Sequence, residues 1–205
     1  SEMSVLLYLL AGLFLPLFPV SMGFNALFGA TDNSLVRTAL LLAWPQIGLT
    51  LASTSPVSPP AGLVALALAT SALYAFRALA LREVGQWTGY LATSLWALFW
   101  LPATTDSPSW LLHLLALGVS APLVLLVLLT AGLQRRFGAA YTGLYGGLAE
   151  AVPRFAGVLV MVVLASVATP VFPAFFTMLG MVVTTVPEAP ATAATLVVIW
   201  LLWTW

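Results

Sequence analysis

Charged side chains are too few in this chain to form a surface that faces water. They make up 6% of the 205 residues, whereas about 25% is usual for a soluble domain. Hydrophobic residues account for 62% of the chain. A fold built from this composition exposes mainly apolar side chains, so the sequence favours a protein that folds in a lipid bilayer.

Long apolar stretches indicate the kind of membrane protein. A helix that crosses the roughly 30 Å hydrocarbon layer needs about 20 apolar residues, and several stretches reach or approach this length. They are apolar on every face, unlike the alternating strands of a β-barrel. We therefore predict an all-α, polytopic bundle that forms a single transmembrane domain over residues 1–205. The seven or eight expected spans are 5–27, 35–51, 62–81, 87–101, 110–133, 153–168, 175–186 and 192–205.

The positions of the basic residues predict the orientation of this bundle. All six fall near the first, third and fifth predicted loops, and they are Arg37, Arg77, Arg82, Arg135, Arg136 and Arg154. By the positive-inside rule these loops are cytoplasmic, and the N-terminus lies outside an inner (cytoplasmic) membrane. The opening stretch 5–15 is expected to be mature structure, because Glu2 stands where a secretory signal has basic residues.

Tryptophan residues lie mostly near the ends of the predicted spans. They include Trp87, Trp96, Trp100, Trp110, Trp200, Trp203 and Trp205. Aromatic residues gather at both interfaces of a membrane protein. The sequence therefore predicts an aromatic belt.

The residue types that are missing exclude several functions. Without Cys the chain forms no disulfide, iron–sulfur cluster or thiolate metal site. Six Arg balance six acidic residues, which gives no reason to expect a nucleic-acid partner. Gly143, Gly146 and Gly147 lack the Lys of a phosphate-binding loop. We predict no enzyme activity, no cofactor and no metal.

Ionisable groups inside the predicted spans are almost absent. An ion path needs such groups at depth, because they are costly in lipid and occur where they are used. The single candidate is His113, close to Trp110. We favour an interfacial His that bonds water or a neighbour, and the alternative is a residual proton relay, since imidazole titrates near neutral pH. Other polar residues are expected to bond neighbouring helices rather than a substrate, namely Asn25, Gln46, Thr93, Ser94, Ser120 and Thr177.

Prolines are predicted to break helices at two separate points. Pro16 and Pro19 fall in the first span, and Pro170 and Pro173 separate the sixth from the seventh. Each proline removes a backbone donor. Paired breaks often mark ion sites in transporters, but a kink filled by packing is an equally good interpretation. A row of small residues, Ala61, Ala65, Ala69 and Ala72, would allow close approach of another helix.

Four stretches resemble motifs of a known family. Residues 14–21 are similar to its K-x-P-x-x-P-x-H break, and residues 82–90 to its D-x-K-R-x-x-A-Y turn. Residues 113–136 resemble H-x-x-x-H-x-x-S-K followed by A-G and a basic end. Residues 146–175 resemble G-G-L-x-x-x-x-P followed by L-P-x-F-x-x-F-x-x-E.

These motifs belong to the antiporter-like subunits of respiratory complex I, Mrp-type cation/proton antiporters, membrane-bound hydrogenases and related inorganic-carbon uptake complexes. The resemblance runs nearly end to end of this chain and covers the central and C-terminal core of those longer proteins. In that family, buried Lys, His and Glu carry protons along the membrane midplane. Here the matching positions hold Phe14, Ser21, Ala43, Leu117, Ala121 and Met178. His113 alone keeps the family's residue.

The resemblance thus implies a truncated, degenerate subunit that serves as an anchor or scaffold in a larger energy-converting or transport complex. Its expected partners are other membrane subunits, lipid and a hydrophilic enzyme subunit. The alternative is a subunit that conducts protons or cations through water at the helix breaks, with His113 as the titrating group. A third possibility is a half-site that lines a quinone or lipid cleft on a partner.

Overall fold

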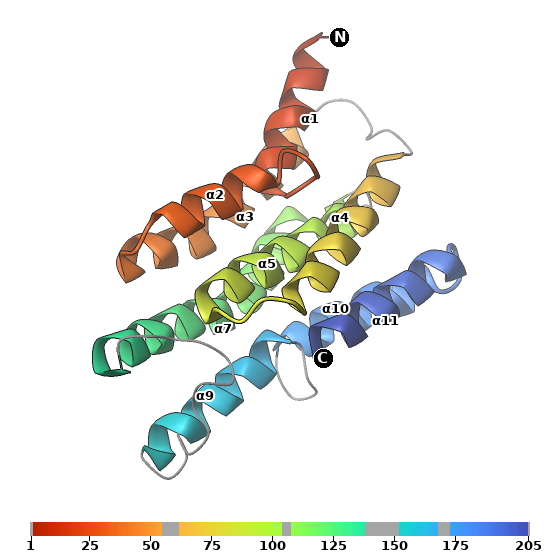
Figure 1. Ribbon diagram of the computed structural model, residues 1–205. Helices are drawn as coiled ribbons and strands as arrows, with labels where there is room; N and C mark the ends of the chain where they lie inside the picture. The colour runs from red at the N-terminus through yellow and green to blue at the C-terminus, as the bar shows by residue number, and fades with distance from the viewer. Residues whose placement is uncertain (1, 55–61, 104–107, 138–151, 168–172, 205) are drawn as a thin grey trace.

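The computed structural model describes residues 2–54, 62–103, 108–137, 152–167 and 173–204, and over these ranges it is helical without strands (Figure 1). The helices are α1 (Glu2–Phe14), α2 (Met22–Ala30), α3 (Ser34–Thr54), α4 (Gly62–Ala78), α5 (Val84–Ala97), α6 (Trp100–Ala103), α7 (Ser109–Phe137), α9 (Pro153–Ser166), α10 (Pro173–Thr185) and α11 (Pro190–Thr204). The predicted all-α class is confirmed.

Helix lengths differ from the predicted spans. Within the described residues, α3 and α7 are the two helices long and apolar enough to cross a membrane by themselves, and five further apolar helices are shorter. Proline shortens several of them, because α1 ends two residues before Pro16 and α10 begins at Pro173. Pro45, in contrast, lies within a continuous α3. Helix length alone therefore does not give seven or eight spans.

Helix α5 packs antiparallel to α4. Ser71 of α4 bonds Ser94 of α5, and one turn further along α4 the Tyr74 ring packs on Tyr90, which is one turn earlier in α5. In the same way α9 and α10 follow one another back along α7. A Cβ atom added to Gly132 would lie 3.8 Å from the Phe155 ring of α9, and one added to Gly118 would lie 3.5 Å from Pro173 of α10.

Helix α5 occupies the centre of the bundle, between α4, α2 and α7 (Figure 1). Residues 91–100 are all buried. Gly89 lets α2 approach, since an added Cβ atom would lie only 2.8 Å from the Asn25 side-chain oxygen. Trp96 is fully buried, with its ring centre 4.8 Å from that of Phe24.

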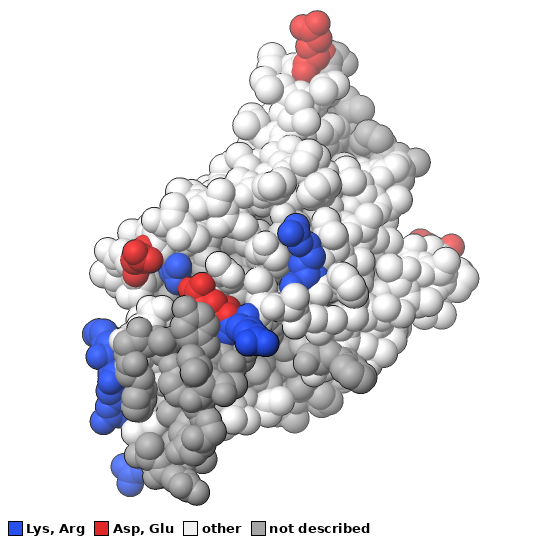
Figure 2. Space-filling view, viewed as in Figure 1, with Lys and Arg blue, Asp and Glu red and all other residues white. Residues whose placement is uncertain are grey.

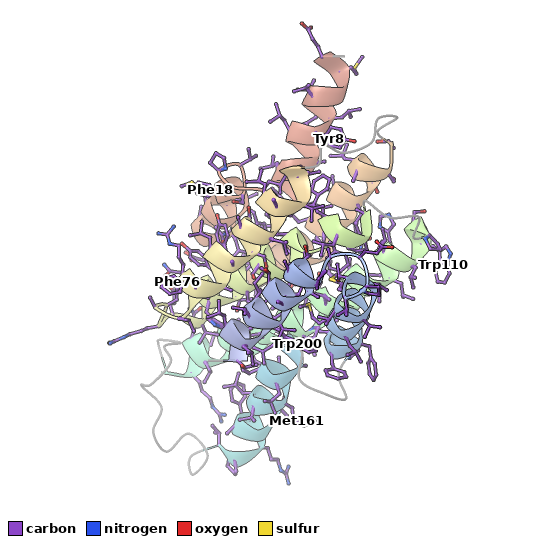
Figure 3. All side chains as sticks on the ribbon, turned by 90° about the vertical axis from the view of Figure 1, so that its right-hand side faces the viewer. Tyr8, Phe18, Phe76, Trp110, Met161 and Trp200 are labelled. Carbon is purple, nitrogen blue, oxygen red and sulfur yellow. The ribbon has the colours of Figure 1, made fainter. Side chains whose placement is uncertain are left out.

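The predicted aromatic belt is wrong for three of its members. Trp96, Trp100 and Trp203 lie in the core, because their indole N–H groups reach acceptors inside the bundle and their rings fill space between helices. Trp110, at the start of α7, is 67% exposed and points away from the bundle (Figure 3). Position near a helix end therefore did not distinguish an interfacial Trp from a core Trp.

The outer surface is largely apolar. Large hydrophobic side chains such as Met3, Phe76 and Met161 are at least 60% exposed, and in Figure 3 Phe76 and Trp110 project from opposite sides of the bundle. Most of the face in Figure 2 is white, and its charged groups form separate small patches, one of which is a blue patch near the middle of the view. Exposed apolar area of this extent is unusual for a soluble monomer.

Candidate functional site

The break between α1 and α2 is the first of the two proline sites. Pro16 and Pro19 lie between the end of α1 at Phe14 and the start of α2 at Met22, and the Phe18–Pro19 peptide bond is cis. Most of this segment lies in the core, since Leu15 and Ser21 are fully buried. A buried break leaves backbone groups without helical partners, so their new partners decide what the site can do.

Two tryptophans bond the carbonyl groups that the break frees. The indole Nε1–H of Trp44 in α3 donates to the Leu13 carbonyl at 2.9 Å, and that of Trp100 in α6 donates to the Leu15 carbonyl at 3.0 Å. The Gly12 carbonyl accepts from the Leu17 backbone N–H at 2.8 Å. These carbonyl oxygens are therefore already engaged by groups that the protein holds in place.

Helix α4 supplies the remaining partners. Thr70 Oγ1 accepts from the Phe18 backbone N–H at 3.0 Å, and the hydroxyls of Ser21 and Tyr74 are 3.0 Å apart. The side chains of other helices that bond this segment are thus two indoles and two hydroxyls. The first break is a packed, hydrogen-bonded junction of five helices, α1, α2, α3, α4 and α6.

Gly48 of α3 lets this junction close. An added Cβ atom would lie 2.7 Å from the Leu15 backbone nitrogen and 2.8 Å from the Phe14 carbonyl carbon. Real Cβ atoms do not approach backbone this closely. A glycine is therefore required for α3 to pack against the end of α1.

The second proline site is described only in part. Pro170 lies outside the described residues. Pro173 is the first residue of α10, a position where its missing N–H costs no helical bond. It is exposed and lies beside Gly118 of α7.

His113 lies in the second turn of α7 and pairs with Gln46 of α3. Its Nδ1 bonds the Gln46 side-chain oxygen, and the Gln46 amide nitrogen donates to the His113 backbone carbonyl at 3.1 Å. Because the amide oxygen only accepts, Nδ1 carries the hydrogen. Both side chains are half-buried. The described residues hold no group of three His, Cys, Asp or Glu that could bind a metal.

The six positions that the sequence comparison above set against ion-carrying residues do not share one environment. Ser21 and Met178 are buried, and Phe14 is half-buried with its ring centre 4.6 Å from that of Trp44. The other three lie on exposed helix faces, and they are Ala43, Leu117 and Ala121. Three of these positions therefore face inward and three face outward.

The polar residues expected to connect helices do so in most cases. Asn25 donates to Thr93 at 2.8 Å, and the paired bonds of Ser71 and Ser94 join α4 to α5. Trp96 donates to Ser120 at 3.3 Å, and Trp203 of α11 donates to Ser94 at 2.8 Å. Thr177 differs, because it bonds the Pro173 carbonyl within its own helix.

The sequence did not identify the residues that satisfy the first break. Trp44, Thr70, Tyr74 and Trp100 come from three helices other than those the break connects. A buried Trp or Tyr usually has a hydrogen-bond partner. The sequence alone does not identify which acceptor it bonds. In the alanine row, Ala61 lies outside the described residues, Ala65 and Ala69 are exposed on α4, and Ala72 is half-buried.

Neither a scan against models of protein families nor a search of curated proteins finds a match to this chain.

Proposed function

We propose that this protein is a non-catalytic membrane subunit, an anchor or scaffold in a larger energy-converting or transport complex. It is a truncated, degenerate relative of the antiporter-like subunits whose motifs it resembles. If α1 with α2, α5 with α6, and α9 with α10 each count as one crossing, the described helices give seven crossings. An odd number of crossings puts the two termini on opposite sides of the membrane.

The apolar outer surface supports the membrane location. The exposed faces of α1, α7 and α9 consist mainly of large hydrophobic side chains. The Arg residues lie at the start of α3, at the end of α4 and just beyond it, at the end of α7 and at the start of α9. In an antiparallel bundle these positions share one end, which we assign to the cytoplasmic side, with the N-terminus outside.

The observation that supports the scaffold role is the hydrogen bonding of the backbone groups at the first break. An ion path through a broken helix needs backbone or side-chain groups that can exchange partners with the ion or with water. Here the Leu13 and Leu15 carbonyls bond indoles, and the Phe18 N–H bonds Thr70. With these groups engaged and the family's ion-carrying residues replaced, the chain is suited to hold partners rather than to conduct.

Surfaces for such partners remain on the outside. Ala65 and Ala69 are exposed on α4, so a helix of another subunit could approach this backbone closely. Ala43 and Ala121 are exposed on α3 and α7. Small exposed residues on three helices fit a role in assembly.

Gentle-detergent purification from native membranes tests this proposal. We expect the chain to co-migrate in fixed ratio with other membrane subunits, and identification of those subunits would name the complex. In liposomes the purified chain is expected to move no protons, with His113→Ala equal to the wild type. A lone homo-oligomer whose proton flux depends on His113 would overturn the scaffold role in favour of conduction.

Two further variants make the liposome measurement specific. Thr70→Val removes the acceptor for the Phe18 N–H at the break, whereas Thr195→Val removes a hydroxyl that bonds only within α11. If the break conducts, these two variants should differ in flux. Equal, background flux in both is the result that the scaffold role requires.

A further inference from the structure

Three exposed Arg side chains lie on two helix ends that pack against each other, the end of α7 and the start of α9. Arg135 and Arg136 are in the last turn of α7, and Arg154 is in the first turn of α9. Gly132 and the Phe155 ring mark the contact between the two helices, one turn or less from these Arg residues. Figure 2 shows blue surface at the lower left, where Figure 1 places these two helix ends.

Positive charge exceeds negative charge in the stretch of sequence that runs from the end of α7 to the start of α9. Residues 134–154 contain three Arg and one acidic residue, Glu150, which gives a net charge of +2 (3 − 1). Glu150 lies outside the described residues. At this junction Arg135 donates to the Ala131 carbonyl of its own helix at 3.4 Å. Elsewhere in the chain, Arg37 donates to the Thr31 carbonyl at 2.7 Å and lies 4.8 Å from the centre of the Phe28 ring. An anion from outside the chain would complement the α7–α9 junction.

A stripe of exposed aliphatic residues leads up to the Arg residues on α7. Leu125 is 51% exposed and Leu128 is 43% exposed. At about 3.6 residues per turn, Leu125 and Arg136 are three turns apart on one face, and Leu128 and Arg135 are two turns apart. This face of α7 therefore has Arg side chains at its C-terminal end and aliphatic side chains in the preceding turns.

Helix α9 repeats the same order in the opposite chain direction. Arg154, Val158 and Met161 follow each other at intervals of four and three residues, which places them on one face. Val158 is 50% exposed and Met161 is 60% exposed. Because α9 is antiparallel to α7, the two stripes have their Arg residues at the same end.

We propose that the α7–α9 junction binds one anionic phospholipid. The phosphate would bond Arg135, Arg136 and Arg154, and the acyl chains would lie along Leu125 and Leu128 of α7 and Val158 and Met161 of α9. A guanidinium matches the geometry of a phosphate and can bond two of its oxygens at once. Basic surfaces at the cytoplasmic end of membrane helices favour anionic headgroups. This inference rests on the membrane location proposed above.

Lipid titration of the purified chain in detergent tests the site. Phosphatidylglycerol and phosphatidylcholine are added separately, and bound lipid is measured by native mass spectrometry. We expect selective binding of phosphatidylglycerol, weakened roughly 25-fold by the double substitution Arg136→Gln with Arg154→Gln. The matched control, Arg77→Gln with Arg82→Gln, removes two positive charges from the same end of the bundle and is expected to weaken binding less than roughly twofold.

The remaining outcomes decide between a defined site and general positive charge. Equal weakening in both double variants would show that general positive charge suffices, and would overturn a defined site. If the Gln double variant loses its helical circular dichroism, the single variants replace it, each with an expected weakening of roughly fivefold. The double Lys variant, Arg136→Lys with Arg154→Lys, keeps the charge and is expected to retain part of the binding.

The first control tests whether the site binds the whole lipid or only its phosphate. The second tests whether the lipid site and the proposed membrane location fail separately. Sodium phosphate that competes as well as phosphatidylglycerol would show a free-anion site and overturn the role of the acyl chains. Extraction of the chain from membranes by alkaline carbonate would overturn both the membrane location and the lipid site. A chain retained in membranes but without preference for phosphatidylglycerol would overturn the lipid site alone.

Discussion

Helices α5 and α1 are of similar length but have opposite environments. α5 contains Thr88, Thr93 and Ser94, and all three are buried. The first turns of α1 are rich in Leu and Val, and most of these side chains are exposed. Burial in this protein therefore does not follow hydrophobicity. Thr93 and Ser94 bond side chains of other helices, whereas Thr88 bonds the Val84 carbonyl of its own helix. Apolar groups lie outside, as expected where the surroundings are themselves apolar.

The largest expected effect separates a core Trp from an exposed one. Trp96→Ala removes a fully buried ring from α5 and should lower the free energy of unfolding by about 3–5 kcal/mol. Trp110→Ala removes a ring that is 67% exposed and should change it by less than about 1 kcal/mol. Unfolding in mixed micelles titrated with a denaturing detergent measures both. Similar losses would show that Trp110 is packed in the assembled protein.

The next prediction concerns the close approach of α3 to α1. Gly48→Ala places a Cβ atom against the Leu15 backbone, so the free energy of unfolding should fall by about 1–3 kcal/mol. Gly180→Ala is the control, because an added Cβ atom there meets nothing within 4 Å. In α10 it should stabilise by roughly 0.5–1 kcal/mol. The same unfolding titration would contradict the described packing if the two variants behaved alike.

The paired serines of α4 and α5 test the polar interior. Ser71→Ala and Ser94→Ala each remove bonds between these helices and should each cost about 0.5–1 kcal/mol. A double-mutant cycle should show that the two losses are not additive, because the hydroxyls bond each other. Thr50→Ala, which removes a hydroxyl that bonds only within α3, serves as the matched control. Additive losses would mean that the pair does not act as one unit.

The smallest effect is expected on the outer face of α1. Leu9 is 55% exposed, so Leu9→Ala should change the free energy of unfolding by less than roughly 0.5 kcal/mol. The same substitution at Leu91, which is 1% exposed in α5, should cost about 2–5 kcal/mol. If Leu9→Ala left the isolated chain unchanged but destabilised the native complex, α1 would be identified as part of a subunit contact.

Much of the local structure could be predicted from local chemistry. Helix α1 ends just before Pro16, because a proline lacks the N–H that continues a helix. Because the apolar stretches are long and apolar on every face, they predicted helices, and the described residues are helical. Helix lengths were less predictable, since short helices such as α6 depend on packing that a sequence window does not contain.

The candidate site was predictable only in part. His113 was singled out because it is the only His of the chain, but its partner Gln46 lies 67 residues away on another helix. Trp100 was expected at an interface, yet it bonds the Leu15 carbonyl across 85 residues of sequence. Such pairs arise from antiparallel packing, and no local pattern records which helices become neighbours.

The sequence by itself determined the helical class and the scarcity of ionisable groups. Tertiary structure alone decided that the first break is closed by Trp44, Thr70 and Trp100, and that the end of α7 packs beside the start of α9. The reason is physical. Helix formation and residue chemistry are local properties, whereas the partner of a freed carbonyl or an exposed charge depends on which distant helices the fold brings together.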